Sequence, residues 1–240
     1  MFGQYSCCTL RPDVRGQCAH SLVPLLVLGY TLSMIITALG SNGFKISSGD
    51  TTIAINPPSA TSKHKVAKFG ADVVLISASH PDWDGEETAS HGDSEPFVAR
   101  GPGAYEVGDV VVNGFSSEGG LGKETSPYGN TVYLISFDGM TTLSLGALSS
   151  AKLPQELRSN IDTVDIVLVP VGGATLDPKA AHDLVVSLEP KLVIPYAVED
   201  KAELAQFLKI AGATGVKPVE KLTLRSKEVL LMSGEIALLE

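Results

Sequence analysis

One stretch of the 240-residue chain decides its fold: Ile76-Ser77-Ala78-Ser79-His80-Pro81-Asp82-Trp83. It follows Asp72-Val73-Val74-Leu75-Ile76, whose continuous apolar run predicts a short, buried β-strand. Directly after this strand come a histidine and an aspartate separated by one residue, His80 and Asp82. Imidazole and carboxylate groups can bind a metal ion or move a proton, so these two side chains are the first candidates for a site.

Outward from this stretch, predicted strands and helices alternate along the chain. Further strands are expected at 51–56, 95–98, 105–112, 164–169 and 191–195, and helices at 61–70, 154–159, 177–188 and 201–211. Short strands at 222–224, 229–232 and 236–239 complete the pattern. Hairpins interleaved with helix–strand units indicate two packed sheets that are covered by helices.

Two local signals in the second half of the chain are more specific. Asp138-Gly139 separates the strand patterns 130–137 and 140–145, and this dipeptide is typical of a tight β-hairpin. Asp177-Pro178 combines a good N-cap residue with proline at the first helical position. It therefore predicts the start of a helix that runs to about Leu188.

The composition bounds the class of protein. Hydrophobic residues make up 44% of the chain, which suits one globular domain with a substantial core. The net charge of −9 and the lack of a Lys/Arg run argue against a nucleic-acid partner, because phosphate binding needs a basic face. The cysteines, Cys7, Cys8 and Cys18, leave no disulfide or thiolate zinc site after residue 18, which fits a reducing compartment.

From Met34 to about Glu199 the chain resembles the Zn-dependent hydrolase-like branch of the metallo-β-lactamase superfamily. The signature of that family, Ser/Thr-His-x-His-x-Asp-His, aligns with residues 77–83. Further matching segments are Leu39-Gly40, 101–107, 130–132, Leu145-Gly146, 170–173, 176–178 and Ile194-Pro195. The resemblance implies an α+β fold, an αββα sandwich in which two mixed β-sheets are flanked by helices.

Most of the metal ligands that the resemblance implies are replaced in this chain. The first metal would be held at positions Ala78, His80 and near Glu118, and the second at Asp82, Trp83 and Ala197, with Ala147 in place of the bridging aspartate. Alanine and tryptophan offer no lone pair to a metal, whereas a catalytic zinc typically needs about three protein ligands. His80 and Asp82 would belong to different metals, so neither site reaches that number unless Glu118 helps. The resemblance still implies that the positions converge around one cleft: Ala78, His80, Asp82, Trp83, Ala147 and Ala197.

The donors that remain support several hypotheses. His80 can be a lone ligand, a general base or a loop histidine bonded to backbone, and the loss of its partners favours the last.

An acidic loop over 82–87 can bind a hard cation such as Mg²⁺ or Ca²⁺, although such runs are more often solvated or cap a helix. Trp83 is expected to fill the space that the metals leave.

The N-terminal region has two competing interpretations. Residues 21–40 carry no charge and follow Arg11 and Arg15, a pattern that on its own indicates a membrane anchor. The resemblance instead makes 34–40 the first strand of the domain. We favour a domain over 34–240, with residues 1–33 as an N-terminal extension that is either a spurious start or a hydrophobic anchor. The expected location is the cytoplasm, with membrane anchoring through 21–40 as the alternative.

Two functions from different classes follow. In the first, the chain is a pseudoenzyme of the hydrolase family with a degenerate metal site, which needs no cofactor and acts by binding a small-molecule ligand or a protein partner. In the second, it is an active metal-dependent hydrolase with a non-standard zinc site around His80, Asp82, Asp84 and Glu118. Neither interpretation includes a nucleic-acid partner. Metal content separates the two functions, because a working site retains its zinc.

Overall fold

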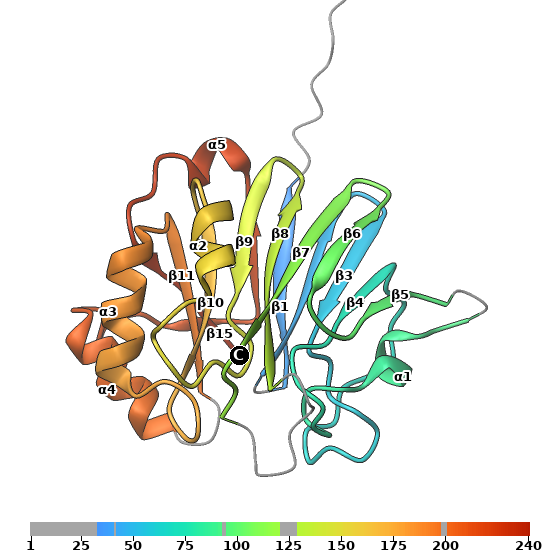
Figure 1. Ribbon diagram of the computed structural model, residues 1–240, viewed down its shortest axis with the longest axis horizontal. Helices are drawn as coiled ribbons and strands as arrows, with labels where there is room; N and C mark the ends of the chain where they lie inside the picture. The colour runs from blue at the N-terminus through green and yellow to red at the C-terminus, as the bar shows by residue number, and fades with distance from the viewer. Residues whose placement is uncertain (1–32, 41, 93–94, 121–128, 198–200) are drawn as a thin grey trace, which may run out of the picture. The chain divides into compact units, whose positions relative to one another are not determined.

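The computed structural model describes residues 33–40, 42–92, 95–120, 129–197 and 201–240, which form two large β-sheets with helices on their outer faces (Figure 1). The expected N-terminal extension, residues 1–33, lies almost entirely outside the described residues.

The first sheet has six strands and contains the start of the domain. Their order is β13 (Lys221–Leu224), β1 (Met34–Leu39), β2 (Gly43–Ser48), β3 (Thr51–Ile55), β4 (Val73–Leu75) and β5 (Phe97–Ala99). The pairs from β13 to β3 are antiparallel, whereas β3, β4 and β5 run parallel, so the sheet is mixed.

The second sheet has seven strands and is also mixed. Their order is β14 (Glu235–Ile236), β11 (Leu192–Ala197), β10 (Ile166–Val171), β9 (Met140–Ser144), β8 (Asn130–Phe137), β7 (Val110–Ser117) and β6 (Gly103–Val107). The strands β6 to β9 pair antiparallel, and β9, β10, β11 and β14 pair parallel. Two short strands, β12 (Pro218–Val219) and β15 (Leu238–Leu239), pair separately.

Five helices of the described residues accompany the two sheets. They are α1 (Glu86–Ala89), α2 (Gln155–Asn160), α3 (Pro178–Leu188), α4 (Lys201–Ile210) and α5 (Ser226–Val229). Figure 1 shows α2 and α3 over the second sheet and α1 beside the first. The predicted N-cap of α3 is confirmed, because the Asp177 carboxylate accepts hydrogen bonds from the backbone N–H groups of Lys179 and Ala180.

Successive side chains of a strand point to opposite faces of the sheet, so the interior is divided into layers. In β10, Ile166 and Leu168 belong to the core between the sheets, whereas Val167 and Val169 belong to the core under the helices. A strand that is buried on both faces has a continuously apolar sequence, which is the pattern of β10. The αββα sandwich expected from the resemblance is therefore the fold of the described residues.

Residues 34–39 form the strand expected of a domain that starts at Met34. β1 lies inside the first sheet, where it pairs with β13 on one side and β2 on the other. These residues are thus not the second half of a helix over 21–40; residues 21–32 lie outside the described part. No helix among the described residues is long and apolar enough to cross a membrane.

Three local predictions were wrong. Residues 61–70 form no helix, because the backbone N–H of Phe69 bonds to Thr88 rather than within the segment. Residues 105–112 are not one strand but the hairpin of β6 and β7, which turns at Gly108 with φ +60°. Residues 229–232 are not a strand, because their N–H groups make helical bonds such as Met232 to Val229.

A chain that begins at Met34 is predicted to be soluble and to unfold cooperatively, with a midpoint close to that of the full chain. A matched chain that begins at Asn42 lacks β1 and is expected not to fold. The loss of β1 exposes the side chains that pack against the buried Met34, Ile36 and Leu39. Burial of each of these three side chains contributes about 1.5–3 kcal/mol to the free energy of unfolding. Thermal unfolding followed by circular dichroism tests both chains; equal melting of the two would contradict the placement of β1.

Candidate functional site

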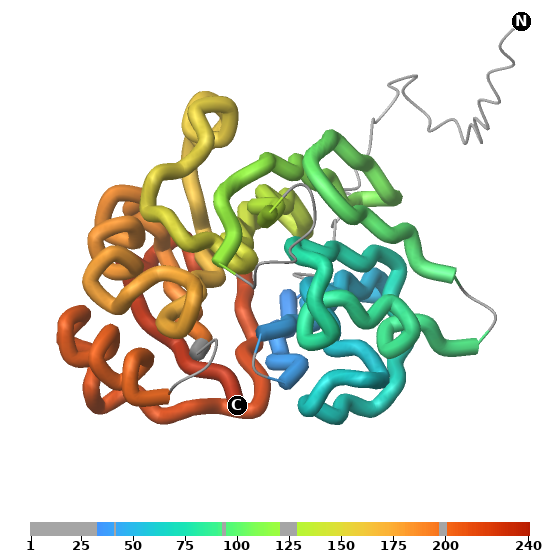
Figure 2. Tube along the Cα trace, turned by 60° about the horizontal axis from the view of Figure 1, so that its bottom comes forward, coloured from blue at the N-terminus to red at the C-terminus, as the bar shows by residue number. Residues whose placement is uncertain are grey.

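The candidate site lies where several strands end at one edge of the sandwich. The loop 76–83 follows β4, the turn 145–147 follows β9, and Ala197 ends β11. Figure 1 shows the loop after β4 at the lower edge of the described domain, and Figure 2 turns this edge forward. Strand ends supply rigid supports, so side chains placed here can be held in fixed geometry.

A buried asparagine fixes the start of the loop after β4. Asn56 is 1% exposed and has a left-handed backbone with φ +47°. Its Oδ1 accepts the backbone N–H of Ser77 at 2.7 Å, and the Ser77 carbonyl accepts the N–H of Thr131 at 2.9 Å. These bonds connect the ends of β3 and β4 in the first sheet to the start of β8 in the second.

A second buried asparagine fixes the turn after β9. The Asn130 Oδ1 accepts the N–H of Ala147 at 2.7 Å, and its Nδ2 donates to the Leu145 carbonyl at 2.9 Å. Gly146, between them, has φ +58°, and a Cβ there would come within 2.4 Å of the Asn130 Oδ1. The Tyr196 hydroxyl donates to the Gly146 carbonyl at 2.6 Å. The turn is therefore held from both β8 and β11.

Three positions that the resemblance implies as metal ligands lie in one packed apolar cluster. Ala78, Trp83 and Ala147 are 3%, 1% and 0% exposed and belong to the same core cluster. The Trp83 ring lies 6.3 Å from the Tyr196 ring between centroids, and Tyr196 contacts Phe44 edge-on at 5.3 Å. Ala197 follows Tyr196 in β11; its side chain lies outside the described part.

His80 and Asp82, the donors predicted from the sequence, lie at the surface side of this cluster. The His80 side chain is 43% exposed and that of Asp82 14%. The His80 Nδ1 accepts the backbone N–H of Asp82 at 3.2 Å and lies 4.0 Å from the Asp82 Oδ2. The Asp82 Oδ1 accepts a hydrogen bond from the Ser62 hydroxyl. His80 is thus a loop histidine with one ring nitrogen bonded to backbone.

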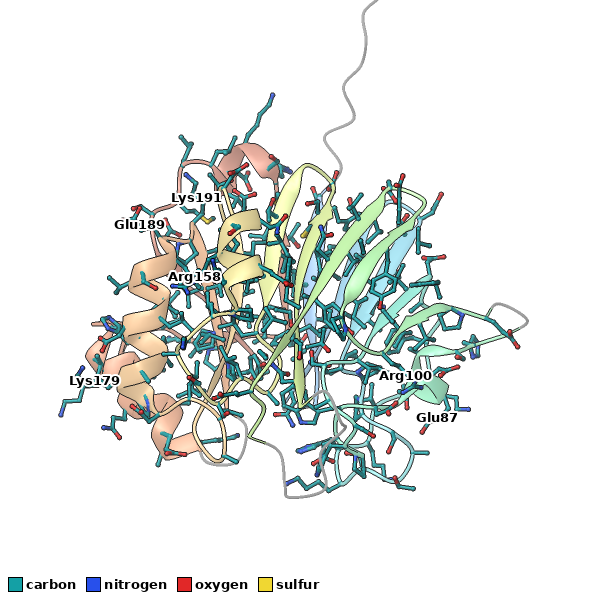
Figure 3. The ribbon with its side chains drawn as sticks, viewed as in Figure 1. Glu87, Arg100, Arg158, Lys179, Glu189 and Lys191 are labelled. Atoms are coloured by element: carbon teal, nitrogen blue, oxygen red, sulfur yellow. The ribbon has the colours of Figure 1, made fainter. Side chains whose placement is uncertain are left out.

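The carboxylates of the acidic loop pair with an arginine from another part of the chain. Arg100, which follows β5 and is labelled in Figure 3, forms ion pairs with Asp84 and Glu86 according to its contact distances. Partial burial opposes the charge of Arg100, but the two carboxylates outweigh it and raise the pKa of the guanidinium. Glu87 accepts the backbone N–H of Ala60 at 2.7 Å. These carboxylates are engaged within the protein, which no local sequence signal indicated because Arg100 lies far along the chain from the loop.

The donors do not assemble into a metal site within the described residues. No group of three or more His, Cys, Asp or Glu side chains in that part of the chain could hold a metal ion, and His80, Asp82, Asp84 and Glu118 all lie within it. Glu118 is exposed, and its backbone carbonyl accepts the N–H of Ser149 at 3.1 Å. The donor set therefore does not fit the metal centre that the resemblance implies.

Two tyrosines that sequence reasoning missed span the interior. The Tyr133 hydroxyl, from β8, donates to the Ile76 carbonyl at 2.9 Å and accepts the N–H of Gly101 at 3.2 Å. Burial raises its pKa to about 12, and burial raises the pKa of Tyr196 further. Both phenols are neutral hydrogen-bond donors at physiological pH. The sequence feature that could have identified them is a tyrosine within an otherwise apolar strand.

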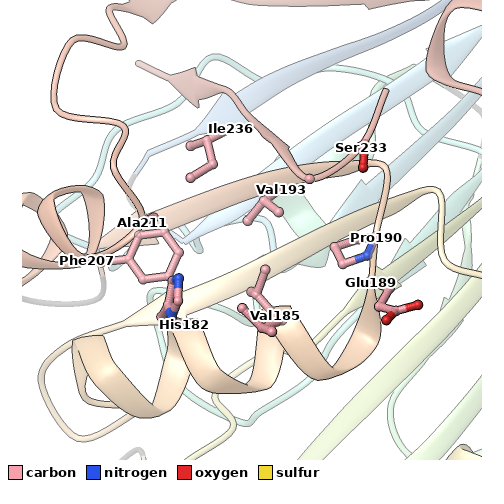
Figure 4. Close-up of a pocket in the computed structure, with 11 residues that line it drawn as sticks. His182, Val185, Glu189, Pro190, Val193, Phe207, Ala211, Ser233 and Ile236 are labelled. Atoms are coloured by element: carbon pink, nitrogen blue, oxygen red, sulfur yellow. The ribbon is translucent and has the colours of Figure 1, made fainter. Parts of the chain in front are cut away.

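A separate pocket lies on the outer face of the second sheet, away from these loops. It encloses about 590 Å³ between α3, α4 and β14 (Figure 4). Val185, Val193 and Phe207 line it, and the ring of His182 packs edge-on against Phe207 with centroids 6.4 Å apart. His182 is therefore partly covered by an aromatic contact rather than standing free on its helix.

Asn130→Ala is predicted to destabilise the protein by about 3 kcal/mol, because it leaves the buried N–H of Ala147 without its partner and removes one of the two hydrogen bonds to the Leu145 carbonyl. Asn160→Ala is the matched control. It removes an exposed bond to the Glu156 carbonyl and is expected to cost less than about 1 kcal/mol. Urea unfolding measures both free energies; equal losses would show that the turn does not depend on Asn130.

Comparisons with known proteins agree with this architecture. Residues 35–197 match the family described as the beta-lactamase superfamily domain. A UPF0173 metal-dependent hydrolase of Pelotomaculum thermopropionicum is 28% identical over 223 residues, which cover 77% of this chain and 96% of the relative.

Solved structures show the same arrangement of sheets. A protein of Thermotoga maritima, proposed to be a Zn-dependent hydrolase of the metallo-β-lactamase superfamily, superposes with a TM-score of 0.64 at 25% identity and covers 86% of this chain and 98% of its own. A proposed metal-dependent hydrolase of Parabacteroides distasonis has a TM-score of 0.61 at 15% identity, with 87% and 94% covered. The family match spans more than half of the chain, and the two mixed sheets agree with it. The chain is therefore a member of the metallo-β-lactamase superfamily and belongs to its hydrolase-like proteins.

Proposed function

We propose that this chain is a metallo-β-lactamase-fold protein whose metal ligands are mostly lost, which is impaired as a zinc hydrolase and acts by binding a ligand or a protein partner. One observation carries the proposal. Ala78, Trp83 and Ala147 stand at former ligand positions and pack together in the core, at most 3% exposed.

The chemistry of zinc supports this function. A catalytic zinc typically has about three protein ligands from nitrogen, oxygen or sulfur donors. Among the described residues at the former centre, His80 and Asp82 offer such donors, and the Nδ1 of His80 already accepts a backbone hydrogen bond. A single histidine–carboxylate pair holds zinc too weakly to keep it through purification.

The way the loops are held also supports a role without metal. Asn56 and Asn130 bind the backbone of the loop after β4 and of the turn after β9, and Trp83 packs against Tyr196. Hydrogen bonds and apolar packing thus stabilise the edge of the sandwich by themselves. A binding role needs this stable edge but does not need a metal-bound water.

A second candidate function is a metal-dependent hydrolase with a non-standard site around His80, Asp82 and Glu118. It is favoured by the relative from Pelotomaculum thermopropionicum, which is called a metal-dependent hydrolase. Such a site would require Glu118 to move toward the loop after β4, since the described side chains form no group of three donors.

Purified protein is predicted to contain no stoichiometric zinc, and His80→Ala is predicted to change the free energy of unfolding by less than about 0.5 kcal/mol, because the ring is only partly buried. Elemental analysis by mass spectrometry measures the first and urea unfolding the second. One or two zinc ions per chain would overturn the proposal in favour of the hydrolase.

Restoring the ligands gives a sharper test of the same function. Ala78→His, Trp83→His, Ala147→Asp and Ala197→His together are predicted to raise zinc affinity by at least about 100-fold, because they recreate three or more ligands per metal. Trp83→His alone is the control, and its zinc affinity is expected to rise little. Competition with a zinc-binding dye measures both proteins. Equal affinity of the folded quadruple variant and the control would show that these positions do not surround one centre.

A further inference from the structure

A further cavity lies beside the former metal centre and shares two residues with the site described above. It encloses about 370 Å³ among β1, β11, α4 and the short strands β12 and β15. Phe44 and Tyr196 belong both to its wall and to the cluster that contains Trp83. The volume is within the range of roughly 300–1,000 Å³ that is typical of small-molecule pockets.

The walls of this cavity are mainly apolar. Phe44, Ile194 and Leu238 are 3%, 0% and 7% exposed, and Leu204 of α4 and Leu239 of β15 also line it. Apolar walls of this kind favour a ligand with a branched or aromatic hydrocarbon body, because transfer of that body from water contributes most of the binding free energy.

Two ionisable residues of opposite sign, Lys201 and Glu240, are the charged members of the described lining. Both are exposed. Neither forms an ion pair with any described residue, and so they do not neutralise each other. Within the part of the chain that the structure describes, the cavity therefore presents an ammonium and a carboxylate without an ion-pair partner next to an apolar interior.

We propose that this cavity binds an apolar amino acid, either free or as a dipeptide. The ligand's carboxylate pairs with the Lys201 ammonium, its ammonium group pairs with the Glu240 carboxylate, and its side chain packs against Ile194, Leu204 and Leu238. The inference rests on the proposed function being binding rather than hydrolysis, and it names the ligand class.

Other ligand classes match the lining less well. A fatty acid would use Lys201 but would bring its carboxylate near Glu240, which repels it. A nucleotide or sugar phosphate needs several basic groups, and Lys201 is the single cation in the described lining. A hydrocarbon without charge would leave both ionic groups without partners.

The test uses calorimetric titration of the full chain with leucine and with leucyl-leucine, which separates the free amino acid from the dipeptide. Lys201→Met and Glu240→Gln are each expected to weaken binding about fivefold, as for an exposed ion pair. Lys209→Met is the matched control, because Lys209 is an exposed lysine of the same helix that does not line the cavity. It is expected to leave binding unchanged.

Paired probes identify which charge meets which residue. N-acetyl-leucine lacks the ammonium group, so its affinity is expected to fall with Lys201→Met but not with Glu240→Gln. Leucinamide lacks the carboxylate and is expected to show the reverse. Comparing these probes with leucine on the unmodified protein keeps the test decisive even if one variant fails to fold.

Two results would overturn the inference: no binding of leucine or leucyl-leucine at millimolar concentration, or binding that neither charge variant weakens. Tighter binding of N-acetyl-leucine than of leucine would also overturn it. Zinc is measured in the same samples and titrations are repeated with EDTA. Stoichiometric zinc contradicts the proposed function whatever leucine does, whereas a zinc-free protein that ignores leucine contradicts only this inference.

Discussion

The arrangement of the candidate site depends on one constraint: backbone amides buried between the two sheets must find partners inside the protein. Asn130, which is 0% exposed, meets this requirement for the turn after β9 by accepting the N–H of Ala147 and donating to the carbonyl of Leu145. Asn56 does the same for Ser77 at the end of β4. Without these side-chain amides the loops would carry unpaired polar groups in an apolar interior, each of which costs about 1–3 kcal/mol.

The same constraint explains how the loops keep their places while the chemistry at former ligand positions differs from the family signature. Their backbone is held by Asn56, Asn130 and Tyr196, whose side chains bond to backbone groups that include the N–H of Ala147. These bonds use backbone groups of the loops, so they do not require a particular side chain at Ala147. Ala78, Trp83 and Ala147 then join the core between the sheets, so the scaffold and the site chemistry are separable in this protein.

Much of the fold was predictable because its signals are local. The Asp138-Gly139 turn joins β8 to β9, and Asp177 caps α3, as the sequence indicates. The apolar run at 72–76 forms β4 in the middle of the parallel strands. Local patterns were misleading where tertiary contacts decide the backbone: the N–H of Phe69 pairs with Thr88, and 61–70 forms turns and irregular structure rather than a helix.

The sequence by itself determined the resemblance to the superfamily and the residues at positions that this resemblance implies as metal ligands, Ala78, Trp83, Ala147 and Ala197, since side-chain identity and spacing need no coordinates. Only the tertiary structure decided that Trp83 packs against Tyr196, that Arg100 pairs with the acidic loop, and that Lys201 and Glu240 meet at one cavity. Each of these pairs is distant along the chain. Such contacts depend on how the sheets bring strand ends together. The local sequence around each residue therefore does not predict how deeply its side chain is buried or which charge it meets.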